Sequence, residues 1–336
     1  MVKQNVVKVK AKKNSIFPLV NDKEKKLKKV VVKESKYHPK NKLNHLKGNE
    51  WLYFTKTILQ TSYPHEYAHD LRKEHGGCKP PQLMQHIIEF FTKKNSIVLD
   101  PFAGVGGTLI GATLAERKCT GIEINKKWID IYSKVCKREK LAKQKIIHDD
   151  CINAMKKMKK KGEEFDFVVS DPPYSIALDK TMCDGVYDIQ HRKTDFNGFS
   201  NYKLDLRNLS SFEEYYDAME EVGKGVKDII KTNGYFVLIM RDSYQDGKYV
   251  PASYEVAKRM ESVGFVLKGF KIWYATGSRM RPYGYPYVFV PNITHQNIIV
   301  LRNEQVWYFI IFLIIYQNFL RNSFENLALL VPAFYM

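Results

Sequence analysis

Asp171-Pro172-Pro173-Tyr174 is the stretch of this chain whose residue types most directly suggest chemistry. It follows the apolar run 165–169, which predicts a buried strand, so the four residues stand where that strand ends. The prolines lack N–H donors, and backbone carbonyls here can accept hydrogen bonds together with the aspartate carboxylate. The tyrosine adds a flat ring for stacking. These groups suit a planar ligand that carries an NH₂ group, such as a nucleobase, although the same four residues can also form a rigid turn.

A second apolar strand, 96–100, ends in an acid and enters a glycine-rich turn. Asp100 is followed by Gly104, Gly106 and Gly107, and a helix is expected over 109–117. The next glycine does not fall at the third position of the dinucleotide fingerprint G-x-G-x-x-G. An acid at the head of the turn would also repel a diphosphate. The turn therefore predicts close contact with a ligand that carries an amino group or a positive charge.

Two further strands end in carboxylates. The strand 119–124 contains Glu123 near its end, and the short strand 145–148 is followed by Asp149 and Asp150. An acid at the end of the second strand can accept hydrogen bonds from ribose hydroxyls. A carboxylate after the third can accept a hydrogen bond from an adenine amino group. The acids together predict a pocket of nucleoside size without phosphates.

With these residues in place, the chain resembles the amino-group DNA methyltransferases, which use S-adenosylmethionine to methylate adenine N6 or cytosine N4. The resemblance spans about residues 51–303 and rests on motifs in the family's order: DPFAGVGGT at 100–108, GIEIN at 121–125, DDC at 149–151 and SDPPY at 170–174. The segment 79–83 (KPPQL) resembles the motif that closes over the methionine end of the cofactor, and 295–301 resembles the last core strand.

The resemblance implies S-adenosylmethionine as the cofactor and a role for each matched residue. The cofactor-binding set comprises Asp100, Phe102, Gly104, Gly106, Lys79 and Pro80 on the methionine side, Glu123 at the ribose and Asp150 at the adenine, with Asp149 as the alternative to Asp150. The catalytic set is Asp171, Pro172, Pro173 and Tyr174. Asp171 and the Pro172 carbonyl would accept the two N–H bonds of the target amino group for direct in-line transfer, while Tyr174 stacks on a base flipped out of the duplex.

The remaining periodicity completes the predicted fold. A serine-capped helix from 211 is expected to stop at Asn233-Gly234, and strands are expected at 235–240, 265–274 and 297–301, with a helix over 254–263. With the four strands above, these predict an α/β, Rossmann-like, seven-stranded, mostly parallel methyltransferase sheet with helices on both faces.

Charge and composition suggest three segments. The formal net charge is +18, and residues 1–48 hold fifteen lysines against three acids, which predicts a basic arm that contacts backbone phosphates or is simply solvated. The methyltransferase domain is expected at 49–303, with 175–209 as a target-recognition loop in which Arg192 and Lys193 are candidate nucleic-acid contacts. The apolar tail 304–336 is a packed element, an interface or a non-native extension, and its run 306–316 is too short to span a membrane.

Two other chemistries are weighed against this interpretation. His65-Glu66-Tyr67-Ala68-His69 matches the zinc-protease pattern H-E-x-x-H, but nothing else in the chain supports a protease, so we assign no metal. None of the five cysteines follows a proline, which argues against the Pro-Cys nucleophile of cytosine-C5 methylation. The odd cysteine count and the charged, signal-free start predict a cytoplasmic protein.

The expected function is therefore site-specific DNA methylation with duplex DNA as partner, no membrane, and a cognate restriction endonuclease as a candidate second partner. Asp171 at the head of the tetrad favours adenine, and Ser170 keeps cytosine open. The alternative is a tRNA or rRNA guanine-N2 methyltransferase, because such enzymes also carry DPPY tetrads. A non-catalytic nucleic-acid binder is disfavoured because no expected motif is broken.

Overall fold

The computed structural model describes residues 37–173, 206–277 and 280–304. Its core is one eight-stranded sheet with the strand order β1-β9-β10-β6-β5-β2-β3-β4. Within this sheet β10 runs antiparallel to both of its neighbours, and the other pairings are parallel. The strands are β1 Ile58–Thr61, β2 Ile97–Asp100, β3 Lys118–Glu123, β4 Lys145–His148, β5 Phe165–Ser170, β6 Ile230–Met240, β9 Val266–Ala275 and β10 His295–Arg302.

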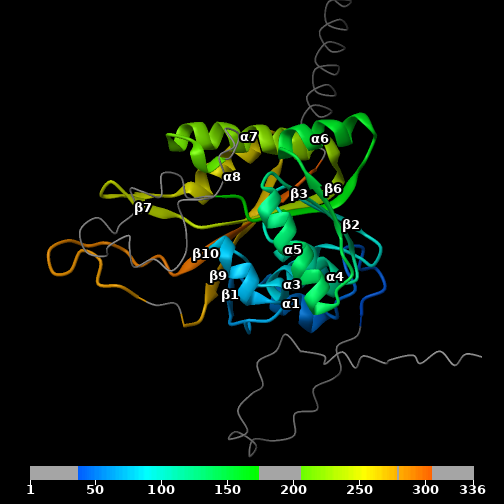
Figure 1. Cartoon of the computed structure of the whole chain (residues 1–336), viewed down its shortest axis with the longest axis horizontal. Helices are drawn as coiled ribbons and strands as arrows, with labels where there is room; N and C mark the ends of the chain where they lie inside the picture. Colours follow the sequence, from blue (N-terminus) through cyan, green and yellow to red (C-terminus); the bar gives the residue numbers. More distant parts are fainter. Residues whose placement is uncertain (1–36, 174–205, 278–279, 305–336) are drawn as a thin grey trace, which may run out of the picture. The chain divides into compact units, whose positions relative to one another are not determined.

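Helices cover both faces of the sheet, as Figure 1 shows. One layer holds α1, α3, α4 and α5, and the other holds α6, α7 and α8. Their bounds are α1 Gly48–Thr55, α2 His69–Arg72, α3 Pro81–Phe91, α4 Gly107–Leu114, α5 Lys126–Glu139, α6 Cys151–Lys160, α7 Phe212–Ile229 and α8 Ala252–Ser262. The arrangement confirms the predicted Rossmann-like α/β fold.

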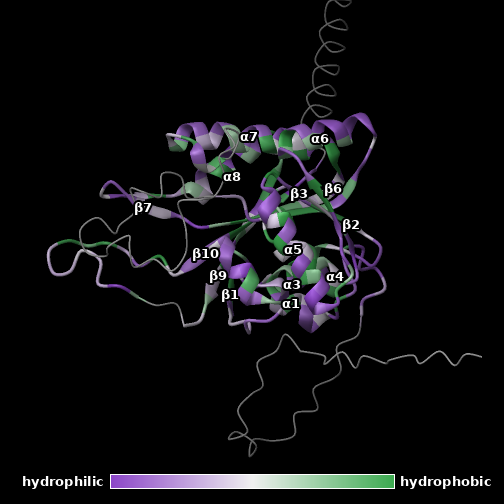
Figure 2. Cartoon of the chain, viewed as in Figure 1, coloured by the Kyte–Doolittle hydropathy of each residue, from purple (hydrophilic) through white to green (hydrophobic). Residues whose placement is uncertain are grey.

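The two helix layers create two cores, and β5 supplies both. Phe167 and Val169 point into the core shared with α3 and α4, whereas Val168 points into the core shared with α6 and α7. Phe91 of α3 stacks on Phe167 with ring centroids 5.3 Å apart. Because successive side chains of a strand point to opposite faces, a strand buried on both sides reads as a continuous apolar run. Figure 2 shows this hydrophobic concentration along the central strands.

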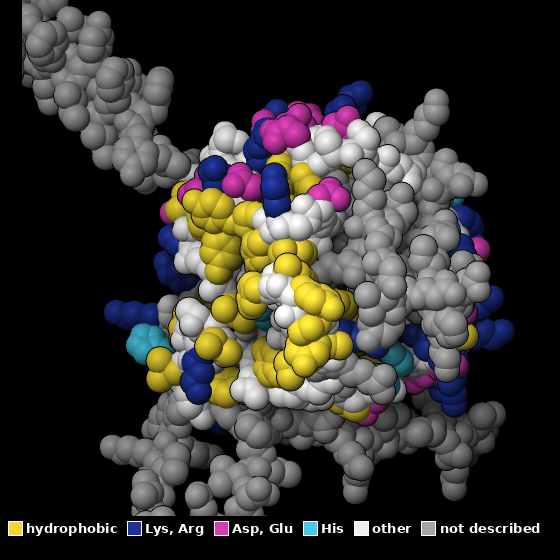
Figure 3. All heavy atoms as spheres, turned by 90° about the vertical axis from the view of Figure 1, so that its left-hand side faces the viewer, with side chains coloured by type: hydrophobic (Ala, Val, Ile, Leu, Met, Phe, Trp, Pro, Cys, Tyr) yellow, Lys and Arg dark blue, Asp and Glu magenta, His cyan; other side chains and the backbone are white. Residues whose placement is uncertain are grey.

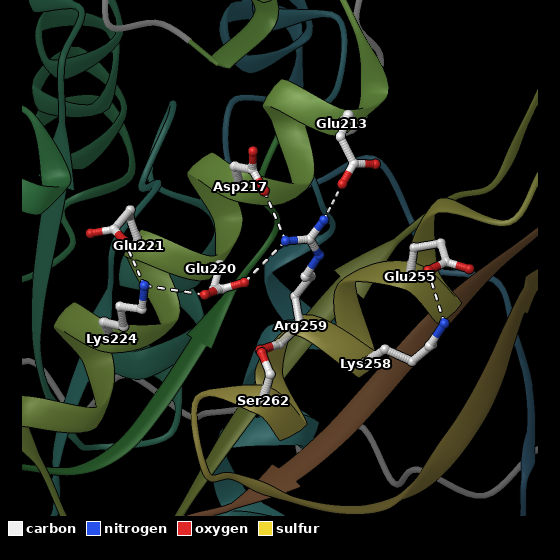
Figure 4. Close-up of polar contacts among 9 residues, drawn as sticks. All are labelled: Glu213, Asp217, Glu220, Glu221, Lys224, Glu255, Lys258, Arg259 and Ser262. Atoms are coloured by element: carbon white, nitrogen blue, oxygen red, sulfur yellow. Dashed lines mark hydrogen bonds and ion pairs between the residues drawn. The ribbon is translucent and has the colours of Figure 1, made fainter.

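A cluster of charges joins the two outer helices of the second layer. Arg259 of α8 pairs with Glu213, Asp217 and Glu220 of α7, with the latter two at 2.8 and 3.1 Å from its Nη1 (Figure 4). Single exposed ion pairs contribute little stability, but one guanidinium shared by three carboxylates forms a network with defined geometry. The network joins α8 to α7 on the outer side of this layer.

The central sheet has one strand more than the sequence predicts. β1 pairs in parallel with β9 at the sheet's edge, and of its four residues only Leu59 is buried. A four-residue segment with one buried side chain has no apolar periodicity to detect. A small exposed hairpin, β7 Ser243–Gln245 with β8 Lys248–Val250, was also not predicted.

The prediction that Asn233-Gly234 ends a helix is wrong. Helix α7 ends at Ile229, and β6 starts at Ile230 and continues through both residues. Asn233 N–H donates to the Asn303 carbonyl at 2.6 Å, and Asn303 N–H donates to the Gly234 carbonyl at 2.9 Å. Asn233 has a φ of +66°, and the pairing of β5 with β6 shifts register nearby. The turn-forming dipeptide therefore marks an irregularity inside a strand.

The H-E-x-x-H segment does not lie on a helix. Helix α2 begins only at His69, and Ala68 before it has left-handed backbone geometry. The rings of His65 and His69 stack on each other, with centroids 4.1 Å apart. Within the described ranges, no group of three or more histidine, cysteine or acidic side chains is placed to hold a metal ion. In the same ranges no helix has the length and apolarity to cross a bilayer.

Candidate active site

The carboxyl ends of β2, β3 and β5 lie side by side, because these three strands are parallel neighbours in the sheet. Asp100 ends β2 and Ser170 ends β5. Ser170 Oγ donates to Asp100 Oδ1 at 2.5 Å, and the Phe102 backbone N–H donates to the same oxygen at 2.9 Å. Burial raises the pKa of Asp100 to about 6, and the bonds from Ser170, Thr108 and Phe102 oppose that shift. The glycine turn and the tetrad strand are thus joined through one buried carboxylate.

The glycine turn brings its backbone against α5. Gly106 has a φ of +80°, which an L side chain rarely adopts, and an added Cβ would lie 2.1 Å from Tyr132 Cδ2. Tyr132 is fully buried and its hydroxyl accepts the Gln144 N–H at 2.9 Å, so its ring has little room to move. The turn has this shape because position 106 is glycine.

Substituting Gly106 with alanine is expected to lower the free energy of unfolding by at least about 2 kcal/mol, because left-handed strain and a core clash add. The expected binding result is a weaker affinity for S-adenosylmethionine, measured by calorimetry beside thermal unfolding. Gly162→Ala is the matched control, since Gly162 has a φ of +67° with open space around it. Equal losses for the two variants would refute the contribution of the Tyr132 contact.

Glu123 at the end of β3 binds the glycine turn. Its Oε2 accepts the Gly104 N–H at 2.7 Å and its Oε1 accepts the Asn125 N–H at 2.8 Å. The side chain is 8% exposed. The two backbone N–H groups hold the carboxylate through both of its oxygens. Glu123, the residue predicted to bind the ribose, is therefore rigidly held at the carboxyl end of β3.

The acids after β4 have local partners of their own. Asp150 is the N-cap of α6, and its carboxylate accepts the Asn153 N–H at 3.0 Å. Asp149 pairs with Lys157 at 2.6 Å. The sequence alone does not show that Asp150 caps the helix and that Asp149 forms the ion pair. Both lie at the carboxyl end of β4, next to Glu123, whose carbonyl accepts the Asp149 N–H at 3.3 Å.

Lys79 contacts the tetrad directly. Its Nζ lies 2.6 Å from Asp171 Oδ2, and the two side chains are 6% and 19% exposed. Burial raises the pKa of Asp171, and the charge and hydrogen bond of Lys79 counteract that rise. Asp171 Oδ1 has no hydrogen-bond partner among the described residues. Beside it Pro172 is buried and Pro173 is half-buried. Asp171 is thus ion-paired through one carboxylate oxygen, and its other oxygen has no hydrogen-bond partner within the described ranges.

Two residues at this edge were not predicted as part of the site. Arg72, 1% exposed, donates from Nη2 to the Lys79 carbonyl and so anchors the backbone that carries Lys79. His75 lies over the glycine turn, where a Cβ on Gly104 would be 3.2 Å from its Nε2, and its ring meets Trp128 edge-on. No motif marks Arg72. His75 belongs to no motif and has no sequence signal beyond its position six residues after the H-E-x-x-H pattern.

The remaining predicted positions are only partly visible. Pro80 is the N-cap of α3, whose first residue is Pro81, and it places Lys79 just before that helix. Phe102 is half-buried at the glycine turn. Tyr174, Arg192 and Lys193 lie outside the described residues.

Comparison with known proteins identifies the family. A family model described as DNA methylase matches residues 2–134 and 165–320, which is most of the chain. The chain belongs to this methylase family. A second model, conserved hypothetical protein 95, matches residues 83–191.

Three curated relatives match stretches of the chain, and one of them is named as a tRNA enzyme. The tRNA (guanine(10)-N2)-dimethyltransferase of Methanocaldococcus jannaschii is 32% identical over 134 residues, 36% of this chain and 35% of its own length. The type II methyltransferase M.HinfI of Haemophilus influenzae is 40% identical over 63 residues, 19% of this chain and 18% of its own. M.HindIII of the same species is 47% identical over 51 residues, 15% and 16% of the two chains. The methylase thus spans between a sixth and about a third of these relatives.

Among solved structures, TrmN from Thermus thermophilus superposes with a TM-score of 0.45 and 14% identity, covering 72% of this chain and 54% of TrmN.

The residues of the methylase fit S-adenosylmethionine, the cofactor of this family. That molecule carries an amino group, a sulfonium cation, a ribose and an adenine but no phosphate. At the carboxyl ends of β2 and β3 lie the buried carboxylates of Asp100 and Glu123, together with a turn in which Gly104 and Gly106 have positive φ. Carboxylates are acceptors for amino and hydroxyl donors and attract positive charge. Asp171 Oδ1 adds a buried acceptor with no described partner.

Proposed function

We propose that this methylase transfers a methyl group to the exocyclic amino group of adenine (N6) or cytosine (N4) in duplex DNA. The observation that carries the proposal is Asp171 directly after β5, whose buried Oδ1 has no hydrogen-bond partner among the described residues. Membership of the methylase family supports it, together with the local likeness to M.HinfI and M.HindIII. The expected setting is site-specific modification, with a cognate restriction endonuclease as a second partner.

The residues act by orientation. S-adenosylmethionine supplies an activated methyl group when it is bound. Asp171 Oδ1 and the Pro172 carbonyl accept the two N–H bonds of the target amino group, so that the nitrogen lone pair points away from both acceptors. Lys79 pairs with the other carboxylate oxygen and opposes the rise in the pKa of Asp171 that burial causes. Correct alignment of reacting groups can supply roughly 7–11 kcal/mol of a barrier.

The base must leave the duplex to reach Asp171. We assign its stacking partner to Tyr174 and recognition of neighbouring nucleotides to 175–209, including Arg192 and Lys193, all outside the described residues. The carboxyl groups at the strand ends take the cofactor roles: Asp100 with Gly104 and Gly106 at the methionine side, Glu123 at the ribose and Asp150 at the adenine.

A second candidate function is guanine-N2 methylation of tRNA. It is favoured by the relative from Methanocaldococcus jannaschii, which gives the longest of the three alignments reported above. A guanine N2 amino group presents the same two N–H donors to Asp171 and Pro172, so the tetrad alone does not separate the two substrates.

A labelled-methyl assay separates the two substrates. The purified chain is incubated with S-adenosylmethionine carrying a tritiated methyl group and either duplex DNA or total tRNA, and the products are digested to nucleosides for mass spectrometry. We expect N6-methyladenine or N4-methylcytosine from DNA. Label confined to N2-methylguanine in tRNA would replace the first proposal with the second.

A further inference from the structure

The loop between β9 and β10 exposes an unusual number of large apolar side chains. Over residues 280–289 the exposed fractions are 78% for Met280, 80% for Tyr285, 89% for Tyr287, 64% for Val288 and 86% for Phe289. Soluble proteins rarely leave such side chains in water as a contiguous group unless the group binds something. Figure 3 shows hydrophobic side chains gathered on the face where this loop, orange in Figure 1, leaves the sheet.

The loop leaves the same edge of the sheet that carries the tetrad. β9 and β6 are both antiparallel to β10, and β6 is parallel to β5, so β9 and β5 point the same way. At the far end of the loop, Arg241 after β6 donates to the Ile293 carbonyl, and Asn297 donates to Asp242 Oδ2 at 3.0 Å. The loop is therefore anchored beside β6, the strand next to Asp171.

The loop is held in shape by its own hydrogen bonds. Asn292 accepts the Arg281 N–H and donates to the Arg281 carbonyl, each at 2.8 Å, which closes the base. Within the turn the N–H groups of Tyr287 and Val288 both donate to the Gly284 carbonyl at 2.8 Å. Gly284 has a φ of +69°, and a Cβ there would lie 2.3 Å from the Val288 carbonyl oxygen. The apolar side chains thus project from a pre-formed turn.

The composition of the loop fits a nucleic acid better than a protein surface. Aromatic residues alternate at 283, 285, 287 and 289, arginine stands at 279 and 281, and no acidic residue occurs between 276 and 294. Bases stack on aromatic rings, and phosphates attract arginine. The chain's formal net charge of +18 favours the same partner.

We infer that loop 280–289 is a wedge that stacks its aromatic side chains on bases next to the target nucleotide in duplex DNA. The inference rests on the proposed function and assigns a contact additional to the base held by the tetrad. Tyr287 and Phe289 are too exposed to be the wall of an enclosed base pocket. They instead reach past the surface, where they can fill the space that opens in the stack when a base leaves it.

The test uses the double variant Tyr287→Ala/Phe289→Ala of the full chain and a fluorescein-labelled duplex that contains the site methylated by the wild type. Removing one base–aromatic stack costs about 5- to 150-fold in affinity. We expect the Kd for this duplex to rise at least about ten-fold, with the Kd for S-adenosylmethionine unchanged. A 2-aminopurine placed beside the target base reports unstacking, and its fluorescence gain on binding is expected to fall.

Leu52→Ala is the matched control. Leu52 is 70% exposed on α1, which leads into the amino end of β1 at the opposite edge of the sheet. If the double variant has the same Kd for duplex as Leu52→Ala, the wedge proposal is wrong, and the proposed function is unaffected. A double variant that binds duplex normally but loses self-association in sedimentation also overturns it, because the loop is then a subunit interface. A wild type that labels only RNA overturns both proposals.

Two further variants separate stacking from charge and shape. In the double variant, the slope of log Kd against log salt concentration is expected to stay unchanged, because tyrosine and phenylalanine carry no charge. In Arg281→Ala this slope is expected to fall by about one, because an arginine that contacts a phosphate releases counterions from the DNA. Gly284→Ala keeps every aromatic side chain but strains the turn, so it is expected to weaken duplex binding as the double variant does. Full binding by Gly284→Ala, together with full binding by the double variant, would leave no role for the loop.

Discussion

Replacing Asp171 with alanine is expected to lower kcat by about 10³-fold while the Kd for S-adenosylmethionine stays within about three-fold, because the variant loses the acceptor that orients the target nitrogen. The Asp171 carboxylate directly follows β5, and its Oδ1 has no partner in the described ranges. Cofactor contacts are assigned to other strand ends, so the loss falls on the transfer step. Single-turnover transfer to duplex DNA measures it separately from binding.

Asp166→Ala is the control for this prediction. Asp166 lies on the same strand β5 and pairs with Lys231 at 2.6 Å, the distance that separates Asp171 from Lys79. It also accepts the Ile97 N–H, so its loss disturbs the fold at the other end of the strand. We expect Asp166→Ala to reduce stability and to leave transfer per folded molecule near the wild-type rate. Full transfer by Asp171→Ala would show that another group orients the target nitrogen.

The strands of the sheet and the acidic residues at their carboxyl ends could be predicted from the sequence, because both depend on the local pattern of apolar and acidic residues. β4 begins and ends at the predicted residues 145 and 148, and β5 extends the predicted run 165–169 by one residue. Strands buried on both faces leave continuous apolar runs, and parallel connection puts their carboxyl ends at one edge. Asp100, Glu123 and Asp171 follow from those two rules.

Contacts between distant segments could not be predicted in the same way. Lys79 and Asp171 are separated by 92 positions, and Ser170 and Asp100 by 70. No periodicity links such residues, and only the packing of α3 and the sheet brings them together. The resemblance implies a cofactor role for Lys79, and it does not predict that its ammonium group contacts Asp171. The exposed loop 280–289 drew no prediction because aromatic residues in a chain normally indicate core.

Lys79→Met is expected to move the acid limb of the kcat profile to higher pH by at least about one unit, because an opposite charge within 4–6 Å lowers a carboxyl pKa by about 1–3 units. Burial already raises the pKa of Asp171, and Lys79 is the group that opposes it. Without the ammonium, more of Asp171 is protonated at neutral pH and cannot accept from the target amino group. Activity at pH 7 is expected to fall about ten-fold and to recover towards pH 9.

The free energy of unfolding tests the Lys79–Asp171 pair independently of activity. Removing one partner of a buried ion pair typically costs about 3–5 kcal/mol. A carboxyl group whose folded pKa is raised above its unfolded value stabilises the fold at low pH and loses that contribution as pH rises through the folded pKa. The unfolding free energy of Lys79→Met should therefore approach the wild-type value as pH falls towards 4 and diverge from it above neutrality. Urea unfolding across this range measures both curves.

Lys231→Met distinguishes this effect from the loss of any lysine. Lys231 pairs with Asp166 at 2.6 Å, but the two side chains are 43% and 31% exposed, whereas Lys79 and Asp171 are 6% and 19% exposed. Water screens the exposed pair, so its loss is expected to shift neither the kcat profile nor the pH dependence of stability. If Lys79→Met instead raised the KM for S-adenosylmethionine and left the pH profile in place, Lys79 would act on the cofactor, and Asp171 would not depend on it for its charge.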